Sequence, residues 1–244
     1  MNSQAWRLYY LGTADHAIRV ACNNEFSHLF CTERGDQGHN IRIVLDDRIW
    51  KLRTNILEPT TNFFSQSIKD AASVYHLYLE DMDPDLLHWL LNFLYNSETP
   101  EELKKLLEDP TTIFQTCYKI IDIAGRIGID DMQWIMVLPL AKLFTKQASK
   151  LIAKHEAIVK KREMNPDDKL LDDSFVEGFF TLAKLFYTQD WLEGLRQIMM
   201  EWLERTNWYA LYYKQFRDEV YKVPGMAKGV DDWPQGKAKA KGED

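Results

Sequence analysis

Five residues near the amino terminus have side chains of the kind that bind zinc: His16, Cys22, His28, Cys31 and His39. Structural zinc sites draw on thiolate and imidazole ligands in closely spaced pairs, and these residues show no such spacing. We therefore expect no metal site. The three cysteines, Cys22, Cys31 and Cys117, form no close pair either, so we expect free and mostly buried thiols in an intracellular protein.

Other residues that could do chemistry are scattered. His76 and His88 fall on a predicted strand and a predicted helix beside aromatic residues, which favours hydrogen bonding over a general base. Paired acids occur at predicted turns or caps, where aspartate accepts bonds from backbone N–H groups: Asp46–Asp47, Asp130–Asp131 and Asp172–Asp173. No glycine spacing fits a phosphate loop. We expect no catalytic residue, no cofactor and no enzyme activity.

Four lysines recur every four residues and share one helical face: Lys142, Lys146, Lys150 and Lys154. A basic amphipathic helix can bind anionic lipid or nucleic acid, so an anionic-surface binder is one alternative function. The net charge of −7 argues against nucleic acid as a partner. We favour a solvated face, with the opposite apolar face packed on the domain: Leu143, Phe144, Leu151, Ile152, Ile158 and Val159.

The whole chain has the composition of a protein with a substantial core. Its 244 residues suit one large domain or a domain with an extension, and 45% are hydrophobic. The amino-terminal sequence lacks the pattern of a secretory signal, and no apolar run approaches the ~20 residues of a membrane span. We expect a soluble protein of the cytoplasm or nucleus.

The stretch 41–52 predicts a β-hairpin. Ile41, Ile43 and Leu45 alternate onto one face, and Trp50 and Leu52 do so on the returning strand after a turn at Asp46–Asp47. A third strand is predicted over 74–79. Between these strands, Pro59 should end one turn and allow Thr60 or Thr61 to cap the next.

The remainder of the sequence is dominated by helical patterns. Asp83 and Pro84 are typical of a helix start, followed by an almost wholly apolar helix through Tyr95. Further helices are predicted over 101–109, 113–126, 132–163, 174–187, 191–205 and 208–221. Gly128 should end the helix over 113–126, and Pro139 should kink or divide the helix over 132–163. An aromatic cluster in the last helices should be mostly core: Trp191, Trp202, Trp208, Tyr209, Tyr212, Tyr213 and Phe216.

This order of elements and its motifs resemble the BTB/POZ family, most closely the free-standing fungal BTB proteins. The resemblance rests on the ungapped run from Asn40 to Phe64, on the segment HLYLEDMDPDLLHWLLNFLYN, and on IIDIAGRIGI at 120–129. The later segment FFTLAKLFYTQDWLEGLRQIMMEWLE, with its Leu195–Arg196 pair, is similar to the helical extension of fungal members.

The resemblance implies an α+β, BTB/POZ-like fold: a small, mostly antiparallel sheet flanked by helices, with a carboxy-terminal helical extension. It implies an amino-terminal segment over 1–39 that docks or dimerises, a BTB/POZ-like domain over 40–145, and an extension over 146–221. Composition predicts a flexible tail over 222–244.

The implied function is non-catalytic protein–protein interaction, through self-association or use as an adaptor. Candidate partner-binding residues are Phe63, Phe64, Ile68 and Tyr95. A substrate adaptor for a cullin-type ubiquitin ligase is a second alternative. Lys69 stands where the family's cullin-recruiting members carry an acidic residue, so the motif does not support a cullin as partner.

Homodimerisation is a further expectation from the resemblance, with Trp6, Tyr9 and Tyr10 as candidate dimer contacts. Many dimeric members form a charged pocket from an Asp before the first strand and a later basic residue. Asn40 and Thr54 occupy those positions here, so that pocket is absent.

Overall fold

The computed structural model describes residues 41–45, 48–52, 75–79, 81–96, 99–128, 132–161 and 163–232. These residues form two compact units. The first, the sheet unit, contains the described residues up to Leu106 together with Lys119–Trp134. The second, the helical unit, contains Leu107–Tyr118 and the described residues from Ile135 onward.

The sheet unit contains a three-stranded sheet in the order β2-β1-β3. β1 (Ile41–Leu45) pairs antiparallel with β2 (Arg48–Leu52), and Ile43 lies opposite Trp50. β3 (Tyr75–Leu79) pairs with β1 in parallel. The predicted alternation is confirmed at the core positions, because Ile43, Leu45, Trp50 and Leu52 are all buried.

The fold class expected from the sequence is nevertheless wrong. Eight α-helices dominate the described residues, and strand structure among them is limited to three segments of five residues each. The sheet is also mixed, with one antiparallel and one parallel pair, and not mostly antiparallel. The described chain is therefore a predominantly helical protein that carries one small sheet, not an α+β BTB/POZ-like fold. The three predicted strands are short, and the helical periodicity after Asp83 extends over most of the described sequence, so it determines the fold class.

The α4 helix (Pro84–Asn96) begins as its sequence predicts. Asp83 Oδ1 accepts bonds from the backbone N–H groups of Asp85 and Leu86, each at 3.2 Å, so it satisfies donors that the first turn leaves unpaired. Leucines at 86, 87, 90 and 91 are buried. This apolar surface gives the sheet unit its core, together with the inward side chains of β1 and β2.

Three helices follow along the chain: α5 (Glu101–Glu108), α6 (Ile113–Ile127) and α7 (Gln133–Lys161). After α6, Gly128 adopts a φ of 66°, the left-handed conformation that glycine reaches at least cost. The α7 helix is not divided at Pro139. Buried neighbours on both sides, including Met136 and Leu140, supply packing that offsets the hydrogen bond lost at the proline.

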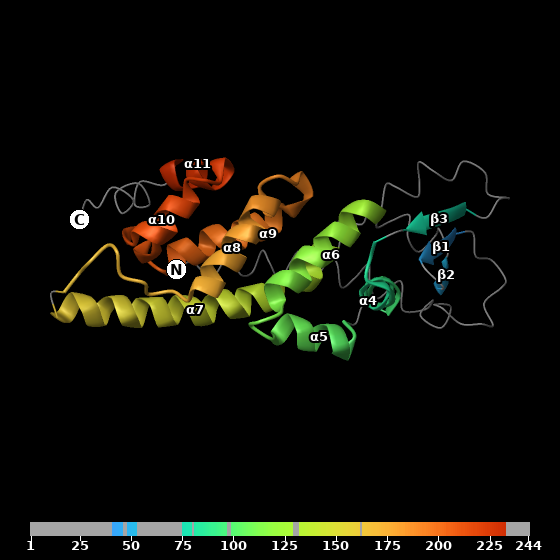
Figure 1. Ribbon diagram of the computed structural model, residues 1–244, viewed down its shortest axis with the longest axis horizontal. Coiled ribbons are helices and arrows are strands. Elements are labelled where there is room, and N and C mark those ends of the chain that lie inside the picture. Colours follow the sequence, from blue (N-terminus) through green and yellow to red (C-terminus); the bar gives the residue numbers. More distant parts are fainter. Residues whose placement is uncertain are drawn as a thin grey trace. The chain divides into compact units, whose positions relative to one another are not determined.

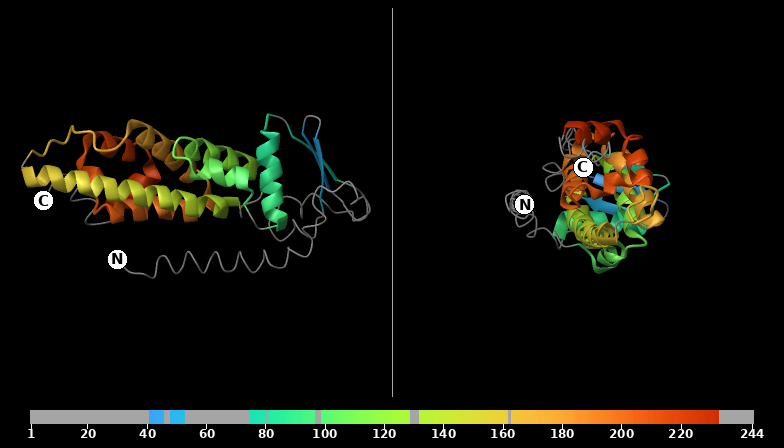
Figure 2. Two further views of the ribbon diagram at one scale, coloured as in Figure 1. Left: turned by 90° about the horizontal axis from the view of Figure 1, so that it is seen from below. Right: turned by 90° about the vertical axis from the view of Figure 1, so that its left-hand side faces the viewer.

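The helical unit is completed by four helices that gather along α7 (Figure 1): α8 (Asp173–Phe186), α9 (Glu193–Arg205), α10 (Lys214–Val220) and α11 (Pro224–Asp232). Its core is a cluster of rings from α7, α8, α9 and α10. Phe179 lies 5.4 Å from Phe144, 5.1 Å from Trp202 and 5.4 Å from Phe216, measured between ring centroids. The second orientation in Figure 2 shows the same gathering of helices along α7.

Two predictions for the end of the chain are wrong in part. The expected helix over 208–221 is broken, because Trp208 takes the left-handed conformation (φ 63°) before the short 3-10 helix Tyr209–Tyr212. The segment expected to be flexible from residue 222 contains α11, where Met226 and Val230 are buried. These two apolar side chains, four residues apart, provide a buried face that the polar composition obscured.

Arg196 joins the end of α8 to the start of α9. Its guanidinium donates bonds to the backbone carbonyls of Phe186, Gln189 and Asp190 at 3.2–3.3 Å. Leu195 beside it is fully buried. The Leu195–Arg196 pair that the sequence analysis singled out therefore has a structural role: one residue fills the core and the other satisfies carbonyls at a helix end.

Candidate interaction groove in the helical unit

Two polar residues occupy the buried face of α7, at positions where helical periodicity calls for apolar side chains. Gln147 is 8% exposed and His155 is 6% exposed. They stand one turn from the buried Leu143 and Leu151. A buried polar side chain costs stability unless it is hydrogen-bonded, so the surroundings of each residue show what it does.

His155 is satisfied within the fold. Its Nδ1 lies 2.8 Å from the Tyr213 hydroxyl, and its ring stacks on Tyr209 with the centroids 4.0 Å apart. Burial, followed by the charges of Asp168 and Tyr212, raises the pKa of Tyr213 to about 12. The phenol therefore keeps its proton at neutral pH, and a hydrogen bond joins its hydroxyl to His155 Nδ1. This pair anchors α7 to the segment that follows α9.

A hollow of about 320 Å³ opens beside this pair. Its wall includes Tyr209 and Tyr212, together with Glu156 and Lys160 of opposite charge. The His155 ring already lies against Tyr209, so the aromatic surface is used within the fold. We interpret this hollow as the outer edge of a structural cluster.

Gln147 has a different environment. None of the described residues makes a hydrogen bond to its side chain, and that side chain lines a larger hollow of about 690 Å³. We call this hollow the groove. It is walled by the first part of α6, the middle of α7 and the first half of α8. An amide with two donors and an accepting oxygen thus faces a space that another molecule could occupy.

The groove has an apolar wall with a polar edge. Phe114, Leu143 and Phe175 form the apolar part, and Tyr118, which is 49% exposed, extends it outward. The edge carries Thr111, Gln115, Ser174 and Thr181. An apolar wall with an exposed aromatic residue and a polar edge is the composition of a protein-binding surface.

Glycine shapes one side of the groove. A Cβ atom on Gly178 would lie 2.3 Å from Phe114 Cδ2, so α8 could not approach this ring with any other residue. The Phe114 ring packs edge-on against Phe175, with centroids 5.9 Å apart. The absence of a side chain at Gly178 thus allows two helices to hold Phe114 in the groove wall.

The charges on the groove are of one sign. Asp172 and Glu177 line it, both are exposed, and none of the described residues that line it with them is cationic. We expected Asp172 to cap a helix. It does occupy the N-cap position of α8, as expected, but its side chain makes no cap hydrogen bond. Its neighbour Asp173 is instead bound by Lys169 at 3.0 Å and by Gln215 at 3.2 Å.

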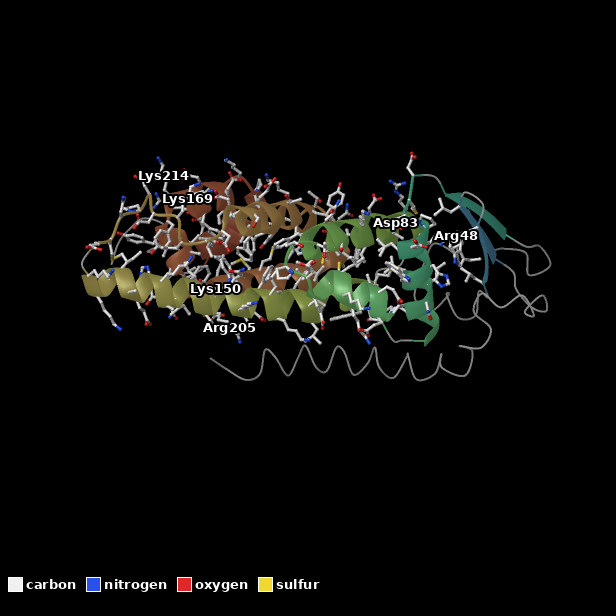
Figure 3. The ribbon with its side chains drawn as sticks, turned by 60° about the horizontal axis from the view of Figure 1, so that its bottom comes forward. Arg48, Asp83, Lys150, Lys169, Arg205 and Lys214 are labelled. Carbon is white, nitrogen blue, oxygen red and sulfur yellow. The ribbon has the colours of Figure 1, made fainter. Side chains whose placement is uncertain are left out.

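The four lysines of the predicted basic face are all exposed, and two of them make contacts within the fold. Lys142 pairs with Glu108 at 3.8 Å, and Lys154 donates to the carbonyl of Leu170 at 2.8 Å. Lys150 is exposed on α7 (Figure 3). Lys142 and Lys146 line a smaller hollow of about 210 Å³. The opposite face is apolar and buried only in part, since Val159 is 44% exposed.

In the sheet unit, the polar contacts hold the fold together. Trp50 Nε1 donates to His88 Nδ1 at 3.2 Å, and burial lowers the pKa of His88, which keeps it a neutral acceptor. Arg48 binds Asp85 at 2.6 Å. Partial burial raises the pKa of Asp83, but the Leu86 N–H bond and Lys119 outweigh that effect and hold it below the usual range. Figure 3 shows Arg48 and Asp83 in this unit.

Several predicted site residues lie outside the described residues: Trp6, Tyr9, Tyr10, Phe63, Phe64 and Ile68. The same holds for the cysteines and histidines before β1. Tyr95 lies in α4, but its side chain is not among those described. Cys117 is a free thiol that is fully buried, and burial raises its pKa, as expected of an inert core cysteine.

The groove residues were missed by the sequence analysis. Gln147 carried a signal, because a glutamine interrupts the apolar stripe of a long helix between Leu143 and Leu151. Tyr118, Phe175 and Gly178 carried none, because they come from separate helices and share a wall only after folding.

Within the described ranges, no group of histidine, cysteine and acidic side chains is arranged to hold a metal ion. None of the helices there combines the length and apolarity needed to cross a bilayer. No family model matches the sequence, and no curated protein was found to match it.

Proposed function

We propose that this protein is a non-catalytic protein-interaction module that binds a segment of a partner protein in the groove of its helical unit. The observation that carries the proposal is Gln147. It is a nearly buried amide without a hydrogen-bond partner among the described residues, and it lines an apolar groove. Its amide atoms are not among the fully buried, unpartnered side-chain atoms of the described residues, so they meet solvent in the groove and can bond to a segment that binds there.

Two further features support this function. Tyr118 presents an exposed aromatic ring at the groove, the type of residue that anchors interfaces. Among the described polar pairs, His88 with Trp50 and His155 with Tyr213 each satisfy one another within the fold. The cullin-adaptor alternative draws no support from the described residues, since Phe63, Phe64 and Ile68 lie outside them.

The proposal is tested by selecting short random peptides for binding to the immobilised full-length protein. A Thr181→Arg variant places a long cationic side chain in the groove. Ser149→Arg is the matched control, because each hydroxyl is exposed on a helix and donates to the carbonyl four residues earlier. Ser149 is not among the groove residues.

We expect enriched peptides to bind the wild type and Ser149→Arg equally, and Thr181→Arg at least tenfold more weakly. Peptides that bind all three proteins alike, or a selection without enrichment, would contradict a binding function for the groove.

A further inference from the structure

The groove and the smaller hollow adjoin each other, because Pro110 and Leu143 line both. Viewed along the axis of α7, the direction of the Leu143 side chain falls between those of Lys146 and Gln147. At 3.6 residues per turn, Lys146 projects about 60° to one side of Leu143 and Gln147 about 40° to the other. A segment that crosses α7 over Leu143 therefore passes from Lys146 to Gln147.

The two ends of this path carry opposite charge. The smaller hollow is lined by Lys142 and Lys146, and its single acid, Glu108, is already paired with Lys142. Lys146 has no acidic partner among the described residues. The groove at the other end is lined by Asp172 and Glu177 without a cation. The surface is thus basic on one side of Leu143 and acidic on the other.

Gln147 limits the conformation of the occupant. A backbone within an α-helix has already satisfied its own N–H and C=O groups, so it offers a glutamine amide little to bind. An extended backbone keeps both groups free, and one glutamine side chain can donate to its carbonyl and accept from its N–H. The amide of Gln147, which is open to the groove, therefore favours an extended segment over a helix.

From these features we infer that the groove binds an extended segment of another protein that carries an acidic residue at one end, apolar residues in the middle and a basic residue at the other end. The acidic residue lies at Lys146, the apolar residues pack on Leu143, Phe114 and Phe175, and the basic residue lies between Asp172 and Glu177. This inference rests on the proposed interaction function and specifies its ligand and direction.

The test uses the peptides that depend on the groove in the selection described above. We expect each of these peptides to carry an acidic residue and a basic residue on opposite sides of an apolar stretch, in either order along the peptide. Charge reversal then assigns the ends. Glu177→Lys should weaken a peptide of this type about tenfold, and Lys146→Glu about three- to tenfold, as expected when an exposed charge contact becomes repulsive.

Matching changes in the peptide separate the two ends. Reversing the basic residue of the peptide should restore binding to Glu177→Lys but not to Lys146→Glu, and reversing the acidic residue should do the opposite. Lys184→Glu, an exposed position on α8 that does not line the groove, serves as the charge control and should bind normally.

Failure of this inference is distinct from failure of the proposed function. Groove-dependent peptides without a paired charge pattern, or peptides insensitive to both reversals, would overturn the inference and leave the binding function supported. Peptides that bind as helices would overturn the inference as well. The conformation is read from the chemical shifts of an isotope-labelled peptide in the bound state, where α-helical shifts would contradict an extended segment.

Discussion

His155 and Gln147 lie two turns apart on the same face of α7 and differ in one respect. Both are more than nine-tenths buried. His155 has the Tyr213 hydroxyl at 2.8 Å and the Tyr209 ring at 4.0 Å, whereas no hydrogen bond reaches the Gln147 side chain from the described residues. His155 is therefore a polar residue that stabilises the fold, whereas the Gln147 amide is open to a molecule that binds in the groove, as we propose.

The comparison teaches that burial alone does not identify a functional polar residue. A satisfied buried pair rigidifies its surroundings, while an amide that reaches solvent in a groove is open to another molecule. If this interpretation is correct, changes at His155 should reduce stability and spare binding. Changes at Gln147 should do the reverse.

The largest effect on stability is expected from His155→Leu. The substitution removes the hydrogen-bond partner of the Tyr213 hydroxyl and leaves that hydroxyl buried without one, which typically costs about 1–3 kcal/mol. Urea unfolding followed by circular dichroism should show a lower midpoint. Peptide binding of the folded variant should equal that of the wild type. A midpoint shift equivalent to less than about 0.5 kcal/mol would break the comparison.

A smaller loss is expected from Tyr213→Phe, which removes one hydrogen bond from the same pair and should cost about 1 kcal/mol at neutral pH. The loss should depend on pH. Folding raises the pKa of Tyr213 from 10.0 to about 12, so the folded state favours the protonated phenol. The advantage of the wild type is therefore complete below pH 10 and declines as the pH rises through about 12.

We would measure the unfolding midpoints of the wild type and Tyr213→Phe in parallel from pH 8 to about pH 12. The difference between the two midpoints should shrink as the pH rises. A gap between the two proteins that widens as the pH rises would contradict the assigned hydrogen bond.

The smallest effect on stability is expected from Gln147→Leu. Replacing an unpaired, nearly buried amide by an apolar group of similar size should leave the free energy of unfolding unchanged or raise it by up to about 1 kcal/mol. Binding of the selected peptides should fall about tenfold, because one amide partner is lost. Destabilisation as large as that of His155→Leu would mean that Gln147 also holds the fold, and it would remove the basis of the comparison.

Local features of the fold could be predicted from particular residues. The alternation of Ile43 and Leu45 with Trp50 and Leu52 predicted the hairpin, and Asp83 and Pro84 predicted the start of α4. The proportion of helix to strand, which sets the fold class, could not be predicted in this way. The strands are only five residues long, and most described residues lie in helices, including α11 with its buried Met226 and Val230.

The candidate groove could be predicted only at one residue. Gln147 breaks an apolar stripe, and that anomaly is visible in one dimension. The pairing of His155 with Tyr213 spans 58 residues, and no local pattern links the two. The contact of Gly178 with Phe114 depends on how closely two helices cross, which sequence spacing does not encode.

By itself, the sequence determined the hairpin of β1 and β2 and the start of α4, since caps and apolar periodicity act over a few residues. The four-residue spacing also places Gln147 and His155 on the same face of α7 as Leu143 and Leu151, although the sequence analysis did not single them out. Only the tertiary structure decided which of the two would find a hydrogen-bond partner and where Asp172, Glu177 and Lys146 would meet a common surface. Hydrogen bonds and surface charge depend on distances between separate helices, and packing sets those distances.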